Sequence, residues 1–295
     1  MKLATIAPMP EVAGVDHRWI AVGDLDMHVA EAGSGTPVVL LHGSPQHWFE
    51  WRHVILALST QHRLVMPDLR GSGWTRGPGT GFDLATQLRD VLGLLDELGL
   101  DRPILVTHDY SGFIGWRIAF DHPERIAGLV ALGAGHPWLR PSLSMVPQMR
   151  KLWFQPVLAT PGLGPLAARA GRQRTVRYML DWLEPTFDEA EREAFLAVWR
   201  QPEHARGLSA IYRRLILPAM ARLPRGEYDG RHLSVPTRAV LAGKDPVITE
   251  QTLGPWRGTA DDLRVSTAGG AGHYIASDRP DAVAAAVREL TSQRH

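Results

Sequence analysis

The stretch that decides the fold is Ile104-Leu-Val-Thr-His-Asp109-Tyr-Ser111-Gly-Phe-Ile-Gly-Trp116. Its aliphatic run 104–107 predicts a short strand, and the segment 113–120 predicts an amphipathic helix. The small and polar residues between them indicate a sharp turn. In a parallel sheet, such a turn lifts its central residue above the carboxyl ends of the strands, where ligands bind. The central residue is therefore a candidate nucleophile.

Asp109 and Ser111 compete for the central place of this turn. A residue in a strained elbow needs small neighbours two positions before and after it, because strand and helix approach closely there. Ser111 is such a neighbour for Asp109, whereas the residue two positions after Ser111 is the large Phe113. Sterics therefore favour Asp109, although Thr107 before it is bulkier than usual. Taken alone, Asp109 could equally be a cap of the following helix.

The composition is that of an ordinary globular enzyme. The chain has 295 residues, 44% of them hydrophobic, enough for one large domain or a domain with an insert. A net charge of +1 gives no reason to expect binding to nucleic acid or to an anionic membrane. The lack of cysteine excludes disulfides, thiolate metal sites and cysteine nucleophiles. With neither a membrane span nor a signal peptide in the sequence, we expect a cytoplasmic protein.

Strand and helix patterns alternate on both sides of the turn. A hairpin is predicted at 17–31, strands at 38–41, 64–66, 128–132, 237–241 and 263–266, and helices at 51–60, 82–98 and 280–290. This alternation predicts a mostly parallel, doubly wound α/β sheet. The segment 136–222 is helical in character and has no convincing strand. We therefore expect a core of residues 1–135 and 223–295, with a helical cap, or lid, inserted at 136–222.

Two more polar residues follow strands at the same edge of the predicted sheet. Asp245 comes just after strand 237–241, and His273 lies in a glycine-rich loop after strand 263–266. Taken alone, each residue is compatible with a non-catalytic role, as a helix cap or a surface side chain. With Asp109 they give the chain order nucleophile, acid, histidine. We interpret the three residues as a catalytic triad.

An aspartate nucleophile restricts the chemistry. A serine attacking a saturated carbon would give an inert ether, whereas aspartate gives an ester whose own carbonyl water can attack. The predicted reaction is displacement at a saturated carbon, followed by hydrolysis. The second step needs N–H donors for an oxyanion. We expect them from the backbone of Tyr110, next to the nucleophile, and of Ser44, at the end of a neighbouring strand.

Several motifs together resemble one known family. They are His42-Gly43-Ser44-Pro45 with Trp48 and Trp51-Arg52, Pro67-Asp68-Leu69-Arg70-Gly71-Ser72-Gly73, His108-Asp109, Trp116, Pro123-Glu124-Arg125, Gly243-Lys244-Asp245 and Gly272-His273. This combination resembles the α/β-hydrolase-fold epoxide hydrolases and their haloalkane dehalogenase relatives. The resemblance spans nearly the whole chain. It implies an α/β-hydrolase fold that opens a small-molecule epoxide with water to a vicinal diol, without cofactor or metal.

The resemblance also implies proton donors in the cap. Epoxide hydrolases protonate the departing oxygen with cap tyrosines, usually two. Residues 207–213 look like the segment that carries the second, which implies this role for Tyr212. Tyr178 is the candidate first tyrosine, with simple core packing as the alternative. Candidate pocket residues are Trp48, Trp138 and Trp153, although aromatic residues at such places are more often packing.

Other functions are alternatives to an epoxide hydrolase. Haloalkane dehalogenases commonly hold the halide with a Trp directly after the nucleophile, where this chain has Tyr110. Fluoroacetate dehalogenases place Arg there and again four residues after the nucleophile, where this chain has Phe113. A catalytically silent ligand receptor would be expected to have a broken triad. A serine esterase acting through Ser111 is disfavoured sterically, and a homodimer is left possible.

Overall fold

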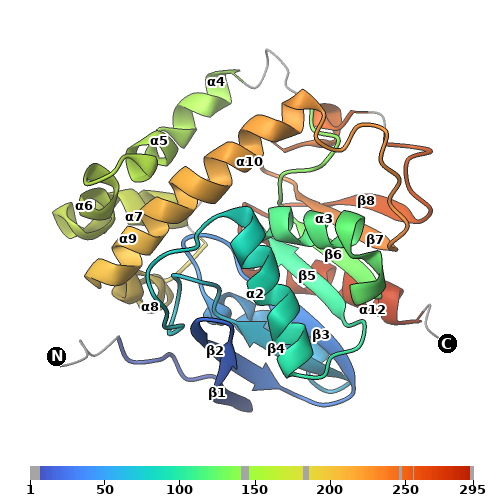
Figure 1. The fold of residues 1–295 in the computed structure, drawn as a ribbon, viewed down its shortest axis with the longest axis horizontal. Coiled ribbons are helices and arrows are strands. Elements are labelled where there is room, and N and C mark those ends of the chain that lie inside the picture. Colours follow the sequence, from blue (N-terminus) through green and yellow to red (C-terminus); the bar gives the residue numbers. More distant parts are fainter. Residues whose placement is uncertain (1–6, 141–145, 182–185, 246–247, 255, 293–295) are drawn as a thin grey trace.

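An eight-stranded sheet forms the centre of the protein (Figure 1). The computed structural model describes residues 7–140, 146–181, 186–245, 248–254 and 256–292. Its strands are β1 (Val15–Val22), β2 (Leu25–Ala32), β3 (Thr36–Leu41), β4 (His62–Pro67), β5 (Ile104–His108), β6 (Gly128–Leu132), β7 (Thr237–Ala242) and β8 (Leu263–Ala268), in the spatial order β1-β2-β4-β3-β5-β6-β7-β8. The first two pairings, β1 with β2 and β2 with β4, are antiparallel, and the others are parallel. The predicted mostly parallel α/β sheet is thereby confirmed.

Helices cover both faces of the sheet. They are α1 (Arg52–Leu58), α2 (Leu84–Glu97), α3 (Ser111–Asp121), α11 (Ile275–Asp278) and α12 (Pro280–Ser292). Alternate side chains of β3 point to opposite faces: Val39 and Leu41 belong to the core cluster that contains α2 and α3, whereas Val38 and Leu40 belong to the cluster that contains α1 and α12. Burial on both faces explains why this strand is continuously apolar.

The chain between β6 and β7 folds into helices. They are α4 (Val146–Met149), α5 (Phe154–Ala159), α6 (Leu163–Arg169), α7 (Arg174–Leu180), α8 (Glu189–Trp199), α9 (Pro202–Ile211) and α10 (Leu217–Arg222). In Figure 1 they lie together beside the sheet. The indole N–H of Trp199 donates to the carbonyl oxygen of Pro45, 2.7 Å away. This helical layer therefore rests on the loop that follows β3.

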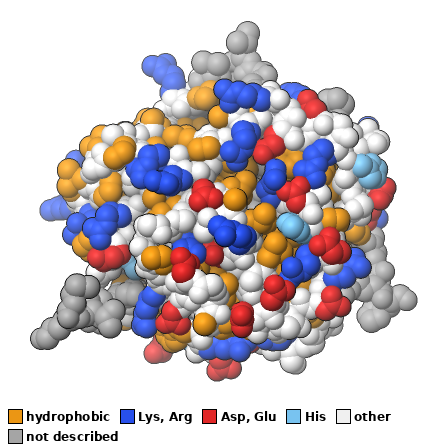
Figure 2. Space-filling model, viewed as in Figure 1, with side chains coloured by type: hydrophobic (Ala, Val, Ile, Leu, Met, Phe, Trp, Pro, Cys, Tyr) orange, Lys and Arg blue, Asp and Glu red, His pale blue; other side chains and the backbone are white. Residues whose placement is uncertain are grey.

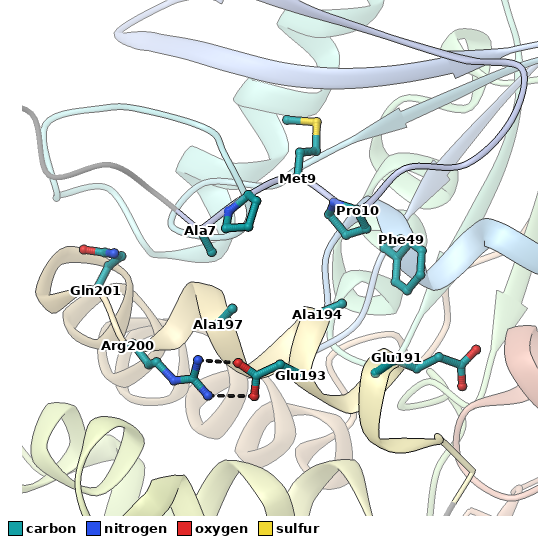
Figure 3. A pocket seen from close by; sticks show the side chains of 12 residues that line it. Ala7, Met9, Pro10, Phe49, Glu191, Glu193, Ala194, Ala197, Arg200 and Gln201 are labelled. Atoms are coloured by element: carbon teal, nitrogen blue, oxygen red, sulfur yellow. Dashed lines mark hydrogen bonds and ion pairs between the residues drawn. The ribbon is translucent and has the colours of Figure 1, made fainter.

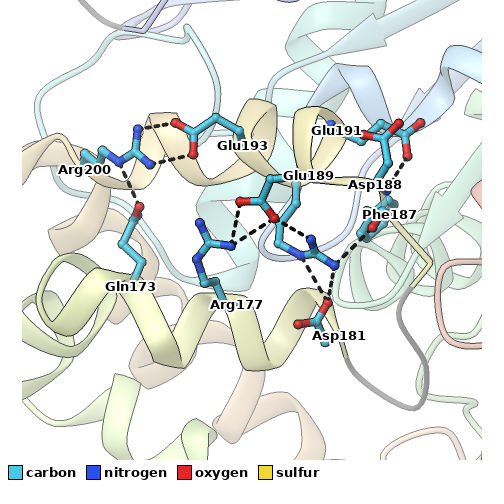
Figure 4. A network of polar contacts seen from close by, with 10 residues as sticks. Gln173, Arg177, Asp181, Phe187, Asp188, Glu189, Glu191, Glu193 and Arg200 are labelled. Atoms are coloured by element: carbon cyan, nitrogen blue, oxygen red, sulfur yellow. Dashed lines mark hydrogen bonds and ion pairs between the residues drawn. The ribbon is translucent and has the colours of Figure 1, made fainter.

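Ion pairs join two helices of this layer (Figure 4). Glu189 of α8 binds the guanidinium groups of Arg177, at 3.0 Å, and Arg192, at 2.8 Å. Arg192 in turn reaches Asp181 at 2.9 Å, just beyond α7. The side chain of Asp188 accepts the N–H of Glu191 and so caps the start of α8. These contacts fix α7 against α8 with charges that are largely at the surface.

The surface carries charges of both signs. On the face drawn in Figure 2, Lys and Arg side chains are interspersed with Asp and Glu. None of the described helices is long and apolar enough to cross a membrane.

Candidate active site

Asp109 occupies a strained turn between β5 and α3. Its φ of 53° lies in the left-handed region that only a few non-glycine residues adopt. Its N–H donates to the carbonyl oxygen of Leu132 at 3.2 Å, and its carbonyl oxygen accepts the N–H of Gly112 at 3.0 Å. A Cβ added at Gly112 would lie 2.2 Å from that of Ala134, so the helix approaches the segment that follows β6 too closely for any side chain. The predicted strand, turn and helix are confirmed here.

Ser111 has a structural place in this turn. Its buried hydroxyl oxygen lies 2.8 Å from the carbonyl oxygens of both Leu41 and His108. It also accepts the N–H of His108 at 3.0 Å. A hydroxyl group enclosed by backbone groups in this way is not presented to a ligand. The steric choice of Asp109 over Ser111 thus agrees with where the two side chains lie.

We expect Ser111→Ala to weaken the fold and leave the chemistry intact. Removing the hydroxyl leaves buried backbone groups without a partner, which costs about 1–3 kcal/mol of unfolding free energy. Urea unfolding measures this loss, and turnover per folded molecule should stay within about threefold, because the nucleophile's own contacts are unchanged. A stable variant without turnover would instead identify Ser111 as the nucleophile.

The two carboxylate oxygens of Asp109 have different neighbours. Oδ2 accepts the backbone N–H of Ser44 at 3.0 Å, whereas Oδ1 lies 3.7 Å from Nε2 of His273. The side chain is 27% exposed, so a ligand can reach it. Tyr110 directly precedes the first turn of α3, where backbone N–H groups have no partner within the helix. One oxygen thus faces a hydrogen-bond donor, and the other faces a titratable ring.

His273 lies between two carboxylates. Nδ1 of its ring is 3.8 Å from Oδ2 of Asp245, and the other oxygen of Asp245 accepts the N–H of Ile248 at 3.1 Å. Both contacts of the ring exceed hydrogen-bond length, as catalytic pairs without substrate often do. The structure therefore brings Asp109, Asp245 and His273 together in the expected order.

Tyr212 lies close to Asp109 and Ser44. Its side chain is buried, at 4% exposure. Burial, then the charge of Asp109, raises its pKa well above the usual value, while a contact with the side chain of Ser44 acts in the opposite direction. At neutral pH this phenol therefore keeps its proton.

A widened helical turn starts at Tyr212. The residues Tyr212–Ile216 form a π-helical turn between α9 and α10, in which the N–H of Leu217 donates to the carbonyl oxygen of Tyr212. Pro218 follows, with no N–H to offer the carbonyl oxygen of Arg214 and with a ring that crowds it. The helix accommodates the proline by widening, as π-turns do at many functional sites. The sequence pattern did not reveal this turn.

The other predicted residues have mixed surroundings. The hydroxyl of Tyr178 donates to the carbonyl oxygen of Lys151 at 3.0 Å, and its ring lies 5.3 Å from that of Trp153, which is 45% exposed. Trp48 is fully buried with its ring 4.7 Å from that of His17. Trp138 is buried against Trp116, Phe120 and His136. The roles assigned to Tyr178 and the tryptophans stay predictions.

Sequence reasoning missed Tyr274, which directly follows His273. Tyr274 is fully buried, and burial followed by the charge of Asp109 raises its pKa. Its hydroxyl donates to the carbonyl oxygen of Met179 in α7, so it joins the loop of His273 to the helical layer. Its position beside the histidine was the only signal available in the sequence.

A hollow of about 620 Å³ lies between the N-terminal segment and α8 (Figure 3). Pro10, Phe49 and Ala194 line it, with Glu193 and Arg200 paired at its rim, and none of the predicted catalytic residues does. We assign it no role. Within the described residues, no three His, Asp or Glu side chains are grouped to hold a metal ion.

Comparisons with known proteins agree with this fold. The sequence profile of the alpha/beta hydrolase fold family matches residues 36–280. A soluble epoxide hydrolase of Corynebacterium sp. (strain C12) is 42% identical over 118 residues, 40% of this chain and 41% of that protein. Haloalkane dehalogenase 2 of Mycobacterium tuberculosis (strain ATCC 25618 / H37Rv) is 28% identical over 291 residues, 96% of this chain and 97% of that protein. The resemblance drawn from the motifs is thereby confirmed.

A solved structure has the same fold. It is that of epoxide hydrolase CorEH without ligand, which matches with a TM-score of 0.79 and 25% identity and covers 95% of this chain and 100% of that chain. The chain aligns with only 38–45% of the length of the curated epoxide hydrolases that it matches first.

Proposed function

Because the chain belongs to the alpha/beta hydrolase fold family, with Asp109 at its nucleophile turn, we propose that it is an epoxide hydrolase. The observation that carries the proposal is the asymmetric setting of the Asp109 carboxylate. Ser44 holds Oδ2 by a backbone N–H, while Oδ1 is left for attack near a buried, protonated Tyr212. Two comparisons support the same reaction. An epoxide hydrolase aligns with part of the chain, and the solved structure of another epoxide hydrolase has the same fold.

In the first step, Oδ1 of Asp109 attacks one ring carbon of the epoxide. A carbon–oxygen bond of the strained ring breaks as the ester bond forms, and the leaving oxygen takes the proton of Tyr212. The products are an alkyl ester of Asp109, carrying a free hydroxyl group, and a tyrosinate. Donation by a phenol is needed because an alkoxide is a poor leaving group in a desolvated site.

In the second step, His273 removes a proton from a water molecule that attacks the Asp109 ester carbon. The resulting imidazolium is stabilised by Asp245. The oxyanion forms at Oδ2, where the N–H of Ser44 already points and the N–H of Tyr110 is proposed to add a second bond. Collapse of this intermediate expels the diol and regenerates the carboxylate. The proton that His273 took passes to the departing oxygen, and the second proton of the water, left on the new carboxyl group, passes to the tyrosinate.

One turnover in H₂¹⁸O tests this route. With enzyme in excess over a terminal epoxide, the oxygen added to the first diol must come from Asp109, so the diol should be unlabelled. The label should instead appear in the peptide that contains Asp109. A diol labelled in its first turnover would show that water attacks the epoxide directly and would overturn the proposal.

We expect Tyr212→Phe to slow ester formation and spare ester hydrolysis. Loss of a general acid typically costs about 10²-fold or more in the step it serves. Phe fills the same buried space, so the fold should hold. Single-turnover quench experiments separate the two steps. Equal slowing of both steps would contradict the role of Tyr212 as proton donor. Tyr228→Phe, at a buried tyrosine of the core outside the proposed machinery, is the matched control.

Haloalkane dehalogenase is the second candidate function. The match over 97% of a haloalkane dehalogenase supports it, but an epoxide hydrolase of the same 28% identity matches over 96% of its own length. Attack by Asp109 on a carbon–halogen bond would use the same triad. The position after the nucleophile weighs against it, because the side chain of Tyr110 offers no indole N–H to a halide.

The remaining assignments are proposals as well. We propose that residues 1–135 and 223–295 form the core and that 136–222 form the cap that closes over the substrate. A cytoplasmic location fits a chain without cysteine. We propose no nucleic-acid partner, because the net charge is +1, and leave open a homodimer.

A further inference from the structure

We propose that Glu50 and His108 form a buried ion pair, here called the pin, in which His108 is held as an imidazolium. The pin positions His273 and the oxyanion loop, which is the segment of Gly43 and Ser44, for ester hydrolysis. The inference rests on the proposed function, because it names what aligns the second step. Neither residue touches substrate in this account, so both are positioning residues.

The pin lies directly behind the nucleophile. His108 ends β5, is fully buried and precedes Asp109 in the chain. Nδ1 of its ring lies 2.7 Å from Oε1 of Glu50, which is equally buried in the 3₁₀ turn η1 (Trp48–Trp51). Nε2 lies 2.9 Å from the backbone carbonyl oxygen of His273. The ring therefore spans the distance between η1 and the loop of the proposed base.

The second oxygen of Glu50 extends the pin to the oxyanion loop. Oε2 accepts the N–H of Gly43 at 2.8 Å. Gly43 directly precedes Ser44, whose N–H holds Asp109. The two segments are tightly packed, because a Cβ added at Gly43 would lie 2.7 Å from Nδ1 of His108 and 2.9 Å from Cβ of Asp109. One buried pair thus contacts three loops: those of the oxyanion donor, the nucleophile and the base.

The contacts of His108 fix its protonation. Both ring nitrogens face oxygen acceptors, a carboxylate and a carbonyl, and a neutral imidazole has only one N–H to give. Burial alone would lower the pKa of His108, but the ion pair with Glu50, with a smaller contribution from the charge of Asp109, raises it to about 9. The other titratable rings facing it are those of His273, at 5.0 Å, and Tyr274, at 6.1 Å.

The two chemical steps depend on the pin unequally. Ester formation uses Oδ1 of Asp109 and the proton of Tyr212. Neither group depends on the position of the loop that carries His273. Hydrolysis needs His273 and the N–H of Ser44 to address one ester group at the same time. Because small errors of alignment can cost up to about 10²-fold in rate, loosening the pin should act mainly on hydrolysis.

Nuclear magnetic resonance of the histidine side chains tests the protonation without any substrate. At pH 8, both ring nitrogens of His108 should carry protons in the wild-type protein, and Glu50→Gln should bring its titration to lower pH. The buried His136, whose pKa burial lowers to about 3, serves as the neutral reference. A neutral His108 ring at pH 8 in the wild-type protein would overturn the proposal, whatever the enzyme's substrate is.

Single-turnover kinetics test the positioning role. Glu50→Gln should slow ester hydrolysis about 10-fold and change ester formation less than about twofold, so that the ester accumulates. Hydrolysis by the wild type should decline above about pH 9, as His108 loses its proton, and that decline should start at lower pH in Glu50→Gln. The double variant with His108→Gln pairs two amides and should recover part of the hydrolysis rate.

Asp90→Asn is the matched control. It removes a buried ion pair of the same 2.7 Å length, with Arg70, so it should lower stability without changing the ratio of the two steps. If Glu50→Gln slows both steps equally and keeps the wild-type pH profile, Glu50 is merely structural and the proposal falls. If the wild type and every variant fail to form an ester with an epoxide, the proposed function fails instead, while the resonance test of His108 still stands.

Discussion

Asp109→Asn is expected to lower epoxide turnover by roughly 10⁴-fold or more. The amide is a far weaker nucleophile than the carboxylate, and no other side chain in the turn can replace it, because the hydroxyl of Ser111 is enclosed by backbone groups. Asn tolerates the left-handed backbone at this position better than most residues, and its side-chain oxygen can still accept the N–H of Ser44. The fold should therefore survive the change.

Diol formation by the purified variant, followed over hours, measures this effect. Thermal unfolding checks that Asp109→Asn is folded, and Ser111→Ala is the comparison, since it should lose stability and keep turnover. Wild-type turnover in Asp109→Asn would refute Asp109 as the nucleophile. Loss of turnover in Ser111→Ala at full folding would transfer that role to the serine.

The second large effect is expected from His273→Gln, which should reduce ester hydrolysis by about 10³-fold and leave ester formation nearly unchanged. Only the second step needs a base to activate water, and Nε2 of His273 lies 3.7 Å from Oδ1 of Asp109. Gln fills a similar volume but cannot take up a proton at neutral pH. The variant should therefore consume about one equivalent of epoxide per enzyme molecule and then stop.

A rapid-quench time course distinguishes this outcome from a general loss of activity. Epoxide should disappear in a burst close to the enzyme concentration, with almost no diol formed. Asp245→Asn should give a milder version of the same behaviour, because Asp245 acts on the ring of His273 and not on the substrate. Slow ester formation without a burst would place His273 in the first step and contradict its assignment.

The sequence predicted the sheet and the triad because their signals are local. A continuous apolar run such as 38–41 has few alternatives to a buried strand, and the carboxyl ends of parallel strands necessarily share an edge. The nucleophile turn followed from the sizes of neighbouring residues alone. Asp245 and His273 could be predicted because each follows the carboxyl end of a strand, and the parallel topology brings these ends to the same edge of the sheet as Asp109.

What the sequence did not reveal depends on contacts between distant segments. Glu50 sits in a 3₁₀ turn that begins before the predicted helix, because the side chain of His47 caps it, and nothing in the local pattern links it to His108. The widened turn at Tyr212 arises from a proline six residues later. Tyr178 is the only tyrosine between residues 136 and 211, which is all that the sequence offers in favour of its role, and its hydroxyl donates to the carbonyl oxygen of Lys151. Side-chain partners of this kind are set by tertiary packing.

The most direct test of the central claim is the intact mass of His273→Gln after separate exposure to a terminal epoxide and to a terminal bromoalkane. We expect a gain equal to the whole epoxide, located on the peptide that contains Asp109, and a much smaller yield of adduct from the bromoalkane. An adduct only from the bromoalkane, with the mass of substrate minus hydrogen bromide, would contradict the account in favour of dehalogenation.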